Sequence, residues 1–222
     1  MADFLDLLSP PARNEVLRGS RRQRYPTGSV HRPDEAVPMA FVVESGLIRL
    51  FVSSDSGRQA SVAYLHPGDA YAALEIIPAG PAHLQALTDA TVLVLDAGNL
   101  TRLATQNMSV SEATIRVMGR ELARLVRIVT VRSLGSMIER LAFDLLERAC
   151  ESQLREGELV CHATHQQLAD SIGSVREVVS RLVRDLSRRG VLVSSPRQIR
   201  VADAAQLSWI VRGLVGSEGP AD

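Results

Sequence analysis

The spacing of apolar and polar positions changes three times along the chain, and each change marks a different kind of element. Between residues 25 and 96, short apolar runs alternate with glycine-containing turns, which is typical of antiparallel strands. Between residues 109 and 134, apolar positions recur every three or four residues, as they do along one face of a helix. Two shorter helical patterns and a hairpin follow, between residues 164 and 201. The pattern therefore predicts an α+β protein.

Four strands are predicted in the first part of the chain, at a spacing that favours an antiparallel jelly roll or barrel. The strands are Ala40–Glu44, Leu47–Ser53, Ala60–Leu65 and Thr91–Leu95. Before them, apolar residues between Phe4 and Leu17 predict one or two short helices that cover one end of this domain. The arginine cluster from Arg18 to Arg24 is interpreted as a solvated edge, because no interleaved aromatic side chains offer stacking surfaces for nucleic acid.

The long helix predicted from Ser109 to Leu134 carries an apolar seam with the alternating three- and four-residue steps of a coiled coil. The seam consists of Ile115, Met118, Leu122, Leu125 and Val129. We expect this seam to be the interface of a homodimer. A second stripe through Val117, Val126 and Ile128 is expected to pack on the barrel.

The long helix is predicted to end at a hinge, where Gly135 is followed by a new helix start. Ser136 with Glu139 fits the capping box, in which two side chains satisfy free amides in the first turn of a helix. The next helix is predicted from Met137 to Cys150.

Residues 164–190 predict a helix-turn-helix. Thr164 with Gln167, and Ser174 with Glu177, each fit a capping box, and Gly173 lies in the turn between the two helices. The second helix has an apolar stripe of Val178, Val179, Leu182, Val183 and Leu186, opposite a polar face rich in arginine. Gly190 ends this helix, and a small hairpin, Val191–Val193 with Ile199–Val201, follows as the wing of a winged helix.

The polar face of the second helix has the chemistry that reads base edges in a major groove. Arginine donates two hydrogen bonds to guanine O6 and N7, and glutamate accepts one from cytosine N4, so Arg176, Glu177 and Arg181 are candidate base contacts. Thr164, His165 and Gln166 are expected to contact phosphate at the start of the first helix. Further DNA-binding candidates are Ser174 and Ser180 on the helix-turn-helix and Arg197 and Arg200 on the hairpin. A solvated arginine-rich face on a plain helical hairpin is the alternative.

Residues 173–181 resemble the recognition helix of the CRP/FNR family of bacterial transcription regulators, through Gly173-x-x-Arg176-Glu177-x-Val179-x-Arg181. The resemblance implies a homodimer that binds a near-palindromic operator in double-stranded DNA, and RNA polymerase as a further partner. His165 stands where the family has an arginine, and Ser180 gives the Ser-Arg ending of the FNR side of the family. The resemblance also implies a cyclic-nucleotide-binding-like sensor domain at residues 1–108, a dimerisation helix and hinge at 109–135, and a winged helix-turn-helix DNA-binding domain at 136–222.

The resemblance places an effector pocket in the barrel, but the residues found there differ from those of the nucleotide-binding members. Ala72 and Ala73 stand where those members hold the ribose with a Gly-Glu pair, and Leu125 and Val126 replace a Thr-Ser pair that contacts adenine. The loop from Pro78 to His83 contains neither arginine nor serine for the cyclic phosphate. Burying that phosphate without a hydrogen-bonding or cationic partner would cost on the order of several kcal/mol. Control by cyclic AMP in the family's usual way is therefore not expected.

Three alternatives remain open for the effector. His83 could be an axial ligand of haem, since the family includes gas sensors with a histidine ligand. The regulator could also need no ligand, or it could bind an apolar or otherwise unrecognised small molecule. No other cofactor and no metal site is expected.

Composition excludes fewer classes of function than the motifs do. The 222 residues contain 25 basic and 25 acidic side chains, but seven arginines against three carboxylates lie between His162 and Val201. Cys150 and Cys161 form no disulfide framework and no metal-binding pair. No catalytic motif is found, so an enzyme is not expected. With no signal peptide and no apolar run of about 20 residues, the chain is expected to be cytoplasmic and to have no membrane partner.

Overall fold

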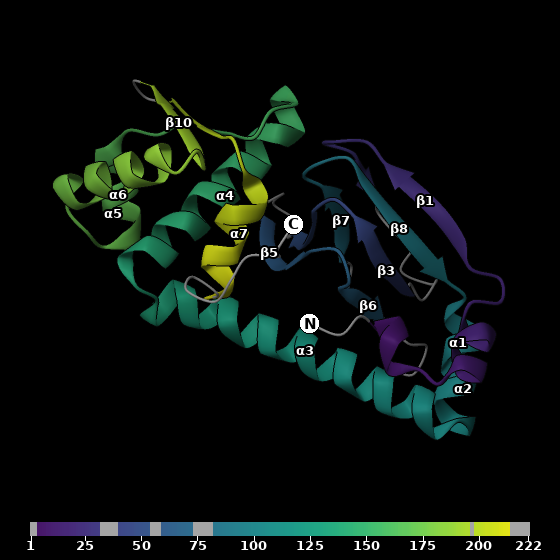
Figure 1. Cartoon of the computed structure of the whole chain (residues 1–222). Helices are drawn as coiled ribbons and strands as arrows, with labels where there is room; N and C mark the ends of the chain where they lie inside the picture. The colour runs from purple at the N-terminus through teal and green to yellow at the C-terminus, as the bar shows by residue number, and fades with distance from the viewer. Residues whose placement is uncertain (1–3, 32–39, 54–58, 73–81, 196–197, 214–222) are drawn as a thin grey trace. The chain divides into compact units, whose positions relative to one another are not determined.

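The structure is a computed structural model that describes residues 4–31, 40–53, 59–72, 82–195 and 198–213 (Figure 1). The chain divides into two compact units, Met1–Leu125 and Val126–Asp222. The boundary between the units lies inside the long helix α3, Met108–Leu134.

The first unit contains two four-stranded antiparallel sheets, as the strand pattern predicts. The strand order is β1-β8-β3-β6 in one sheet and β2-β7-β4-β5 in the other. The strands are β1 (Arg21–Tyr25), β2 (Val30–His31), β3 (Ala40–Ser45), β4 (Ile48–Ser53), β5 (Gln59–Leu65), β6 (Ala70–Ala72), β7 (His83–Ala86) and β8 (Ala90–Leu95). β3, β4, β5 and β8 are the four predicted strands, and the other four are additional.

An apolar core lies between the two sheets, because alternate residues of each strand point to the same face. It contains Phe41, Val43, Ile48, Leu50, Ala63, Leu65, Leu84, Ala86, Ala90 and Val92. The turn between β3 and β4 depends on Gly46, whose φ is +83°. A Cβ atom at this position would collide with the carbonyl oxygen of Asp89, so the turn requires glycine here.

The opposite face of the β1-β8-β3-β6 sheet is covered by helices. Four helical segments contribute residues to one buried cluster on this face. They are the 3-10 helix η1 (Phe4–Leu7), α1 (Pro10–Val16), α2 (Ala97–Gln106) and the first half of α3. The sheet contributes Ala40, Val42, Ala70, Leu93 and Leu95 to the same cluster. The predicted N-terminal helices that cover one end of the domain are therefore confirmed.

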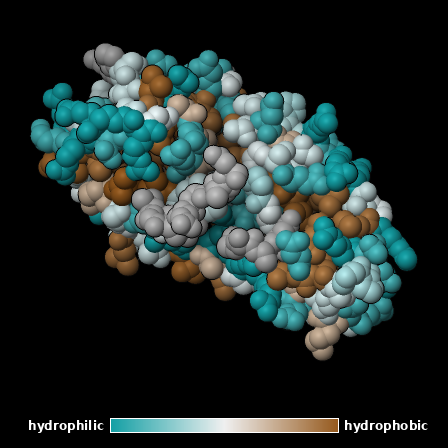
Figure 2. All heavy atoms as spheres, in the orientation of Figure 1, coloured by the Kyte–Doolittle hydropathy of each residue, from teal (hydrophilic) through white to brown (hydrophobic). Residues whose placement is uncertain are grey.

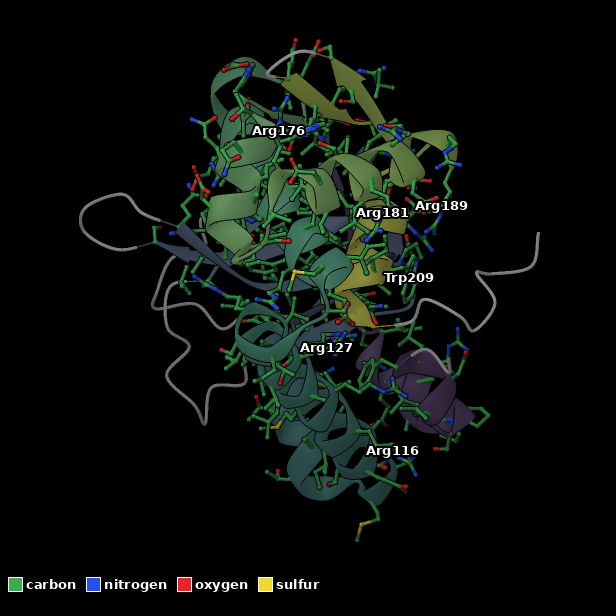
Figure 3. All side chains as sticks on the ribbon, turned by 90° about the vertical axis from the view of Figure 1, so that its left-hand side faces the viewer. Arg116, Arg127, Arg176, Arg181, Arg189 and Trp209 are labelled. Carbon is green, nitrogen blue, oxygen red and sulfur yellow. The ribbon has the colours of Figure 1, made fainter. Side chains whose placement is uncertain are left out.

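The joint between α3 and the next helix α4 (Met137–Glu156) has the predicted capping box. The amide of Glu139 donates to Ser136 Oγ at 3.4 Å, and the amide of Ser136 donates to Glu139 Oε2 at 2.8 Å. Glu139 also forms an ion pair with Arg127 of α3, and Arg127 Nε donates to the Val211 carbonyl at 3.1 Å (Figure 3). The part of α3 that belongs to the second unit is thus tied to two other helices of the same unit.

The second unit is a winged helix-turn-helix. After α4 come β9 (Val160–Cys161), α5 (His165–Ile172), α6 (Arg176–Arg188), β10 (Leu192–Ser195), β11 (Gln198–Val201) and α7 (Ala204–Arg212). β10 and β11 form the predicted hairpin, and β9 pairs with β11 as a third strand that the sequence did not indicate. Among the described residues, no helix is both long and apolar enough to cross a membrane.

Candidate nucleic-acid interface and effector region

The turn between α5 and α6 is closed by backbone hydrogen bonds around Gly173. The predicted box at the start of α5 is present, since Thr164 Oγ1 accepts from the Gln167 amide and Gln167 Oε1 accepts from the Thr164 amide. Gly173 has a φ of +67°, and the next amide, that of Ser174, donates to the Ala169 carbonyl at 2.9 Å. This geometry ends α5 and reverses the chain.

The second predicted capping box, Ser174 with Glu177, is wrong. The residue that caps α6 is Val175, which has extended backbone angles and makes no side-chain cap hydrogen bond. The reason is that the Ser174 amide completes the end of α5, so α6 begins one residue later than the motif predicts. Ser174 therefore lies in the turn, half-buried, and the apolar side chain of Val175 stands 57% exposed before the first helical residue.

The arginine-rich face of α6 is exposed, whereas its apolar stripe is buried. Val179, Val183 and Leu186 are buried, and Val178 and Leu182 are half-buried. The exposed residues of α6 are Arg176, Glu177, Arg181, Arg184 and Arg188. Figure 3 labels Arg176 and Arg181 along α6, with Arg189 beyond its C-terminal end. The three candidate base-reading side chains thus share the free surface at the start of this helix.

His165 connects the two helices of the motif. Its Nδ1 lies 2.9 Å from Ser180 Oγ, a hydrogen bond between the first residue of α5 and the reading helix α6. Partial burial, and secondly the positive charge of Arg176, hold the pKa of His165 below its ordinary value. The ring is therefore neutral at neutral pH. Gln166 is exposed, and its Nε2 donates to Asp170 Oδ1 at 2.8 Å.

The wing carries Arg200 as an exposed residue of β11. Arg197 lies outside the described residues. Ser195 Oγ donates to the Gln198 carbonyl at 3.0 Å, which closes the base of the hairpin tip. The structure thus brings Thr164, His165, Gln166, Arg176, Glu177, Ser180 and Arg181 onto one helix-turn-helix, and Arg200 onto its wing.

Two side chains of α4 position this motif and were not found from the sequence. Arg140 Nη1 donates to the Ile172 carbonyl at 2.9 Å, and its Nε donates to the Gly135 carbonyl at 2.9 Å. Asp144 accepts from Ser171 Oγ at 2.9 Å and from Arg148 Nε at 2.9 Å. The contacts with Ile172 and Ser171 join residues far apart in the chain, so no local pattern indicates them.

The predicted dimer seam is the exposed side of α3. Ile115, Leu122 and Val129 are 68%, 63% and 65% exposed, Leu125 is 42% exposed and Met118 is half-buried. Brown hydrophobic atoms lie along the lower edge of the molecule in Figure 2, where Figure 1 draws α3. Of the predicted second stripe, Val117 packs in the barrel cluster and Ile128 is buried, but Val126 is 57% exposed. The expectation that Val126 packs on the barrel is therefore wrong.

The effector region is held by polar contacts between α3 and the end of the barrel. The Ala72 amide donates to Glu121 Oε1 at 3.2 Å. Arg124 forms an ion pair with Asp69, whose other carboxylate oxygen accepts from the His66 amide at 2.9 Å. Burial raises the pKa of Glu121 to about 7, while the Ala72 amide and Arg124 act to lower it.

The structure does not bring all the predicted effector residues together. His83 begins β7, where it alternates with the core residue Leu84, and its ring lies 5.2 Å from that of Phe51. Ala72 packs on the helix-covered face of the other sheet, so the two side chains lie on opposite outer faces of the sandwich. Leu125 is exposed, Val126 belongs to the second unit, and Ala73 lies outside the described residues.

A small apolar pocket adjoins Ala72. It is lined by Phe4, Phe41, Ala70, Tyr71, Ala72, Leu95, Leu100, Thr114 and Val117. Its volume is about 10 Å³, which is space for about one water molecule. A pocket of this volume is too small for a nucleotide.

Comparison with known families accounts for both units. Residues 22–107 match the model of a cyclic nucleotide-binding domain, and residues 139–209 match that of a Crp-like helix-turn-helix domain. The chain belongs to the CRP/FNR family of transcription regulators. Like other CRP/FNR proteins, it is a DNA-binding transcription regulator, and the family's members are regulators rather than enzymes.

Relatives in the CRP/FNR family align along most of the chain. The Cyclic AMP receptor protein of Thermus thermophilus is 26% identical over 93% of this chain and 95% of the relative. The transcriptional regulator LdrP of the same species is 26% identical over 81% of this chain and 90% of the relative. A crystal structure of a CRP/FNR regulator from Eubacterium rectale, 21% identical, covers 92% of this chain and 95% of its own, with a TM-score of 0.57, which supports the fold.

The described part of this CRP/FNR chain contains no group of three or more His, Cys, Asp or Glu side chains that could hold a metal ion. Cys150 and Cys161 are both buried cysteines in the thiol form, and burial raises the pKa of Cys161 to about 12. Both cysteines are packed into the DNA-binding domain.

Proposed function

We propose that the protein is a homodimer that binds a near-palindromic operator through α6, and that its barrel is not switched by cyclic AMP in the family's usual way. The observation that carries the proposal is the exposed face of α6, on which Arg176, Glu177 and Arg181 stand together near the start of the helix. The N-terminal residues of a recognition helix are those that contact base edges in helix-turn-helix proteins.

The phosphate contacts are assigned to the start of α5 and to the wing. Thr164, His165 and Gln166 lie where the free amides of a helix N-terminus attract anions. Arg200 on the wing adds a cation, with Arg197 as a further candidate. Phosphate contacts fix the register of the protein on the duplex, and the side chains of α6 then read the sequence.

The exposed seam of α3 supports the homodimer. Ile115, Leu122 and Val129 follow one another at intervals of seven residues, with Met118 and Leu125 between them, and contiguous apolar surface of this kind is stabilised by burial against a second copy. A twofold dimer presents two recognition helices to two half-sites about one helical turn, roughly 34 Å, apart. RNA polymerase is the further partner that we propose for this regulator.

Two features argue against cyclic AMP as the usual switch. The Ala72 amide already donates to the Glu121 carboxylate, and the cation of the same network, Arg124, pairs with Asp69. A cyclic phosphate entering this region would meet an acidic side chain and a guanidinium that has a partner. The name of the Thermus relative makes cyclic AMP the competing candidate, and haem ligation by His83 or an unidentified small molecule is the alternative.

The test is selection of operators from random duplexes by the purified protein, followed by binding measurements at a fixed salt concentration with and without cyclic AMP. We expect selection of an inverted repeat, tight binding without any addition, and loss of that binding in Arg176→Ala and Arg181→Ala. Arg116→Ala, at an exposed position of α3 outside the seam, is the matched control. Selection of no sequence would contradict operator binding, and binding that requires cyclic AMP would contradict the proposal about the barrel.

A further inference from the structure

The hydrogen bond between His165 and Ser180 joins a candidate phosphate contact to a candidate base contact. Nδ1 of His165, at the start of α5, lies 2.9 Å from Ser180 Oγ on α6. Ser180 follows Arg176 by four residues, so it lies one turn further along the same face of the helix. Both groups are partly accessible rather than sealed in the core.

The direction of this hydrogen bond decides what Ser180 can offer to DNA. A neutral imidazole has one N–H donor and one acceptor nitrogen, whereas a hydroxyl has one donor hydrogen and two acceptor lone pairs. Phosphate oxygens only accept, so a ring that contacts phosphate through Nε2 must carry its hydrogen there. Nδ1 is then the acceptor, and it receives the Ser180 hydroxyl hydrogen. Ser180 Oγ is left with lone pairs only.

We propose that His165 fixes Ser180 as a hydrogen-bond acceptor, so that the operator position facing Ser180 prefers a base with an amino group in the major groove. Those bases are adenine, through N6, and cytosine, through N4. Guanine and thymine present only oxygen or ring-nitrogen acceptors there, which an acceptor-only serine cannot bond. The inference rests on the proposed operator binding, and it assigns His165 as a positioning residue that determines specificity through Ser180.

The surroundings of His165 favour the neutral ring. Partial burial and the charge of Arg176 on α6 lower its pKa. Of the acidic groups on the elements packed nearby, Asp170 of α5 accepts from Gln166, and Asp144 of α4 accepts from Ser171 and pairs with Arg148. On acidification both ring nitrogens become donors, and the Ser180 hydroxyl is released to donate. The preference should then shift toward guanine or thymine.

The test measures binding to four versions of the selected operator that differ at one base pair. The base pair to vary is the one at which Ser180→Ala, unlike the unmodified protein, no longer distinguishes the four bases. We expect the unmodified protein at pH 8 to favour adenine or cytosine there by about three- to tenfold, the size of one hydrogen bond. His165→Phe keeps a ring but cannot accept a hydrogen bond, so the amino preference should fall to about onefold. His162→Phe, which removes an exposed histidine paired with Glu156, is the control.

The outcomes separate this inference from the proposed function. If the unmodified protein shows no sequence-specific binding to any duplex, operator recognition itself is overturned. Specific binding in which Ser180→Ala alters no position, or in which His165→Phe keeps the amino preference, would overturn only the role of His165. If His165→Phe does not fold, as judged by its thermal unfolding, the unmodified protein decides. In the unmodified protein at pH 8, a preference for adenine or cytosine at the base pair facing Ser180 supports the inference, and a preference for guanine or thymine there refutes it.

Discussion

Glu121 of α3 accepts a hydrogen bond from the backbone amide of Ala72, at the end of the barrel strand β6. The carboxyl group lies beside Tyr71, whose own pKa is raised, first by burial and then by the charge of Glu121. One side chain thus connects the helix that carries the seam with the predicted effector region. It is also an acid whose pKa lies near 7.

Glu121→Gln is predicted to remove a pH dependence of stability. The pKa of Glu121 rises from 4.5 to about 7 on folding, so the folded state holds a proton that the unfolded state has lost within this range. The free energy of unfolding therefore falls as the pH rises from about 4.5 to about 7 and stays lower above it. Glutamine still accepts from the Ala72 amide and has no charge to bury. We expect a gain on the order of 1–3 kcal/mol at pH 8.

Urea unfolding of the two proteins at pH 5 and pH 8 checks this prediction. The difference between them should be small at pH 5 and largest at pH 8. Glu112→Gln, an exposed carboxyl on the same helix that pairs with Arg116, is the control. Equal pH profiles for the unmodified protein and Glu121→Gln would mean that Glu121 ionises in the folded protein as it does in the unfolded chain.

Leu122→Glu is predicted to weaken or abolish dimerisation. Leu122 is 63% exposed in the single chain, and in a twofold seam it would place two carboxylates close together in an apolar interface. Sedimentation equilibrium should show a dissociation constant at least about tenfold higher, since burying unpaired charge costs several kcal/mol. Arg116→Glu puts the same charge on the same helix outside the seam, and it should leave the dimer intact. A dimer that tolerates Leu122→Glu must use another surface.

The sequence predicted those strands whose side chains alternate or run apolar for five or more residues. β3, β4, β5 and β8 each supply two or more buried apolar side chains, and their predicted bounds agree with the structure to within about one residue. β1 was missed because its residues, Arg21–Tyr25, are mostly exposed where the strand pairs with β8 at the edge of a sheet. The arginines of this segment are exposed, as a solvated edge requires, and their pattern gave no strand signal.

Long-range polar contacts were the part of the site that the sequence did not indicate. The capping boxes at Thr164 and Ser136 were found because both partners lie within four residues. The box at Ser174 failed because its amide serves the preceding helix instead. Arg49, completely buried on β4, donates to Ser61 Oγ at 2.6 Å and to the side-chain oxygens of Gln59 and Gln85. Its partners come from two other strands, so only the folded sheet reveals them.

Arg140→Ala is predicted to loosen the helix-turn-helix from α4. The substitution leaves the Ile172 and Gly135 carbonyls without the hydrogen bonds that Arg140 supplies. We expect a loss of about 1–3 kcal/mol in the free energy of unfolding, and weaker operator binding because α5 is less firmly held. Hydrogen exchange should show faster exchange in the last turn of α5. Arg116→Ala removes an exposed ion pair and should change stability by less than about 1 kcal/mol. Unchanged exchange in α5 would show that packing alone holds the motif.

A comparison of Arg181→Ala with Arg184→Ala is predicted to separate two contributions to DNA binding, the recognition of a base and the attraction of a positive charge to phosphate. Both arginines are exposed on α6, and Arg181 lies nearer the N-terminal end, where a recognition helix meets the bases. Loss of a bidentate guanine contact should cost Arg181→Ala about 1–3 kcal/mol on the selected operator and relax the preference at one base pair. Non-specific binding should change little by comparison. Arg184→Ala should affect specific and non-specific duplexes alike, since any contact it makes there is to phosphate. Affinities for both duplexes over a range of salt concentrations provide the comparison. The two variants could instead lose the same affinity on every duplex, with the base preferences of Arg181→Ala unchanged from those of the unmodified protein. In that case Arg181 contributes only charge, and the base-reading role belongs to Arg176 and Glu177.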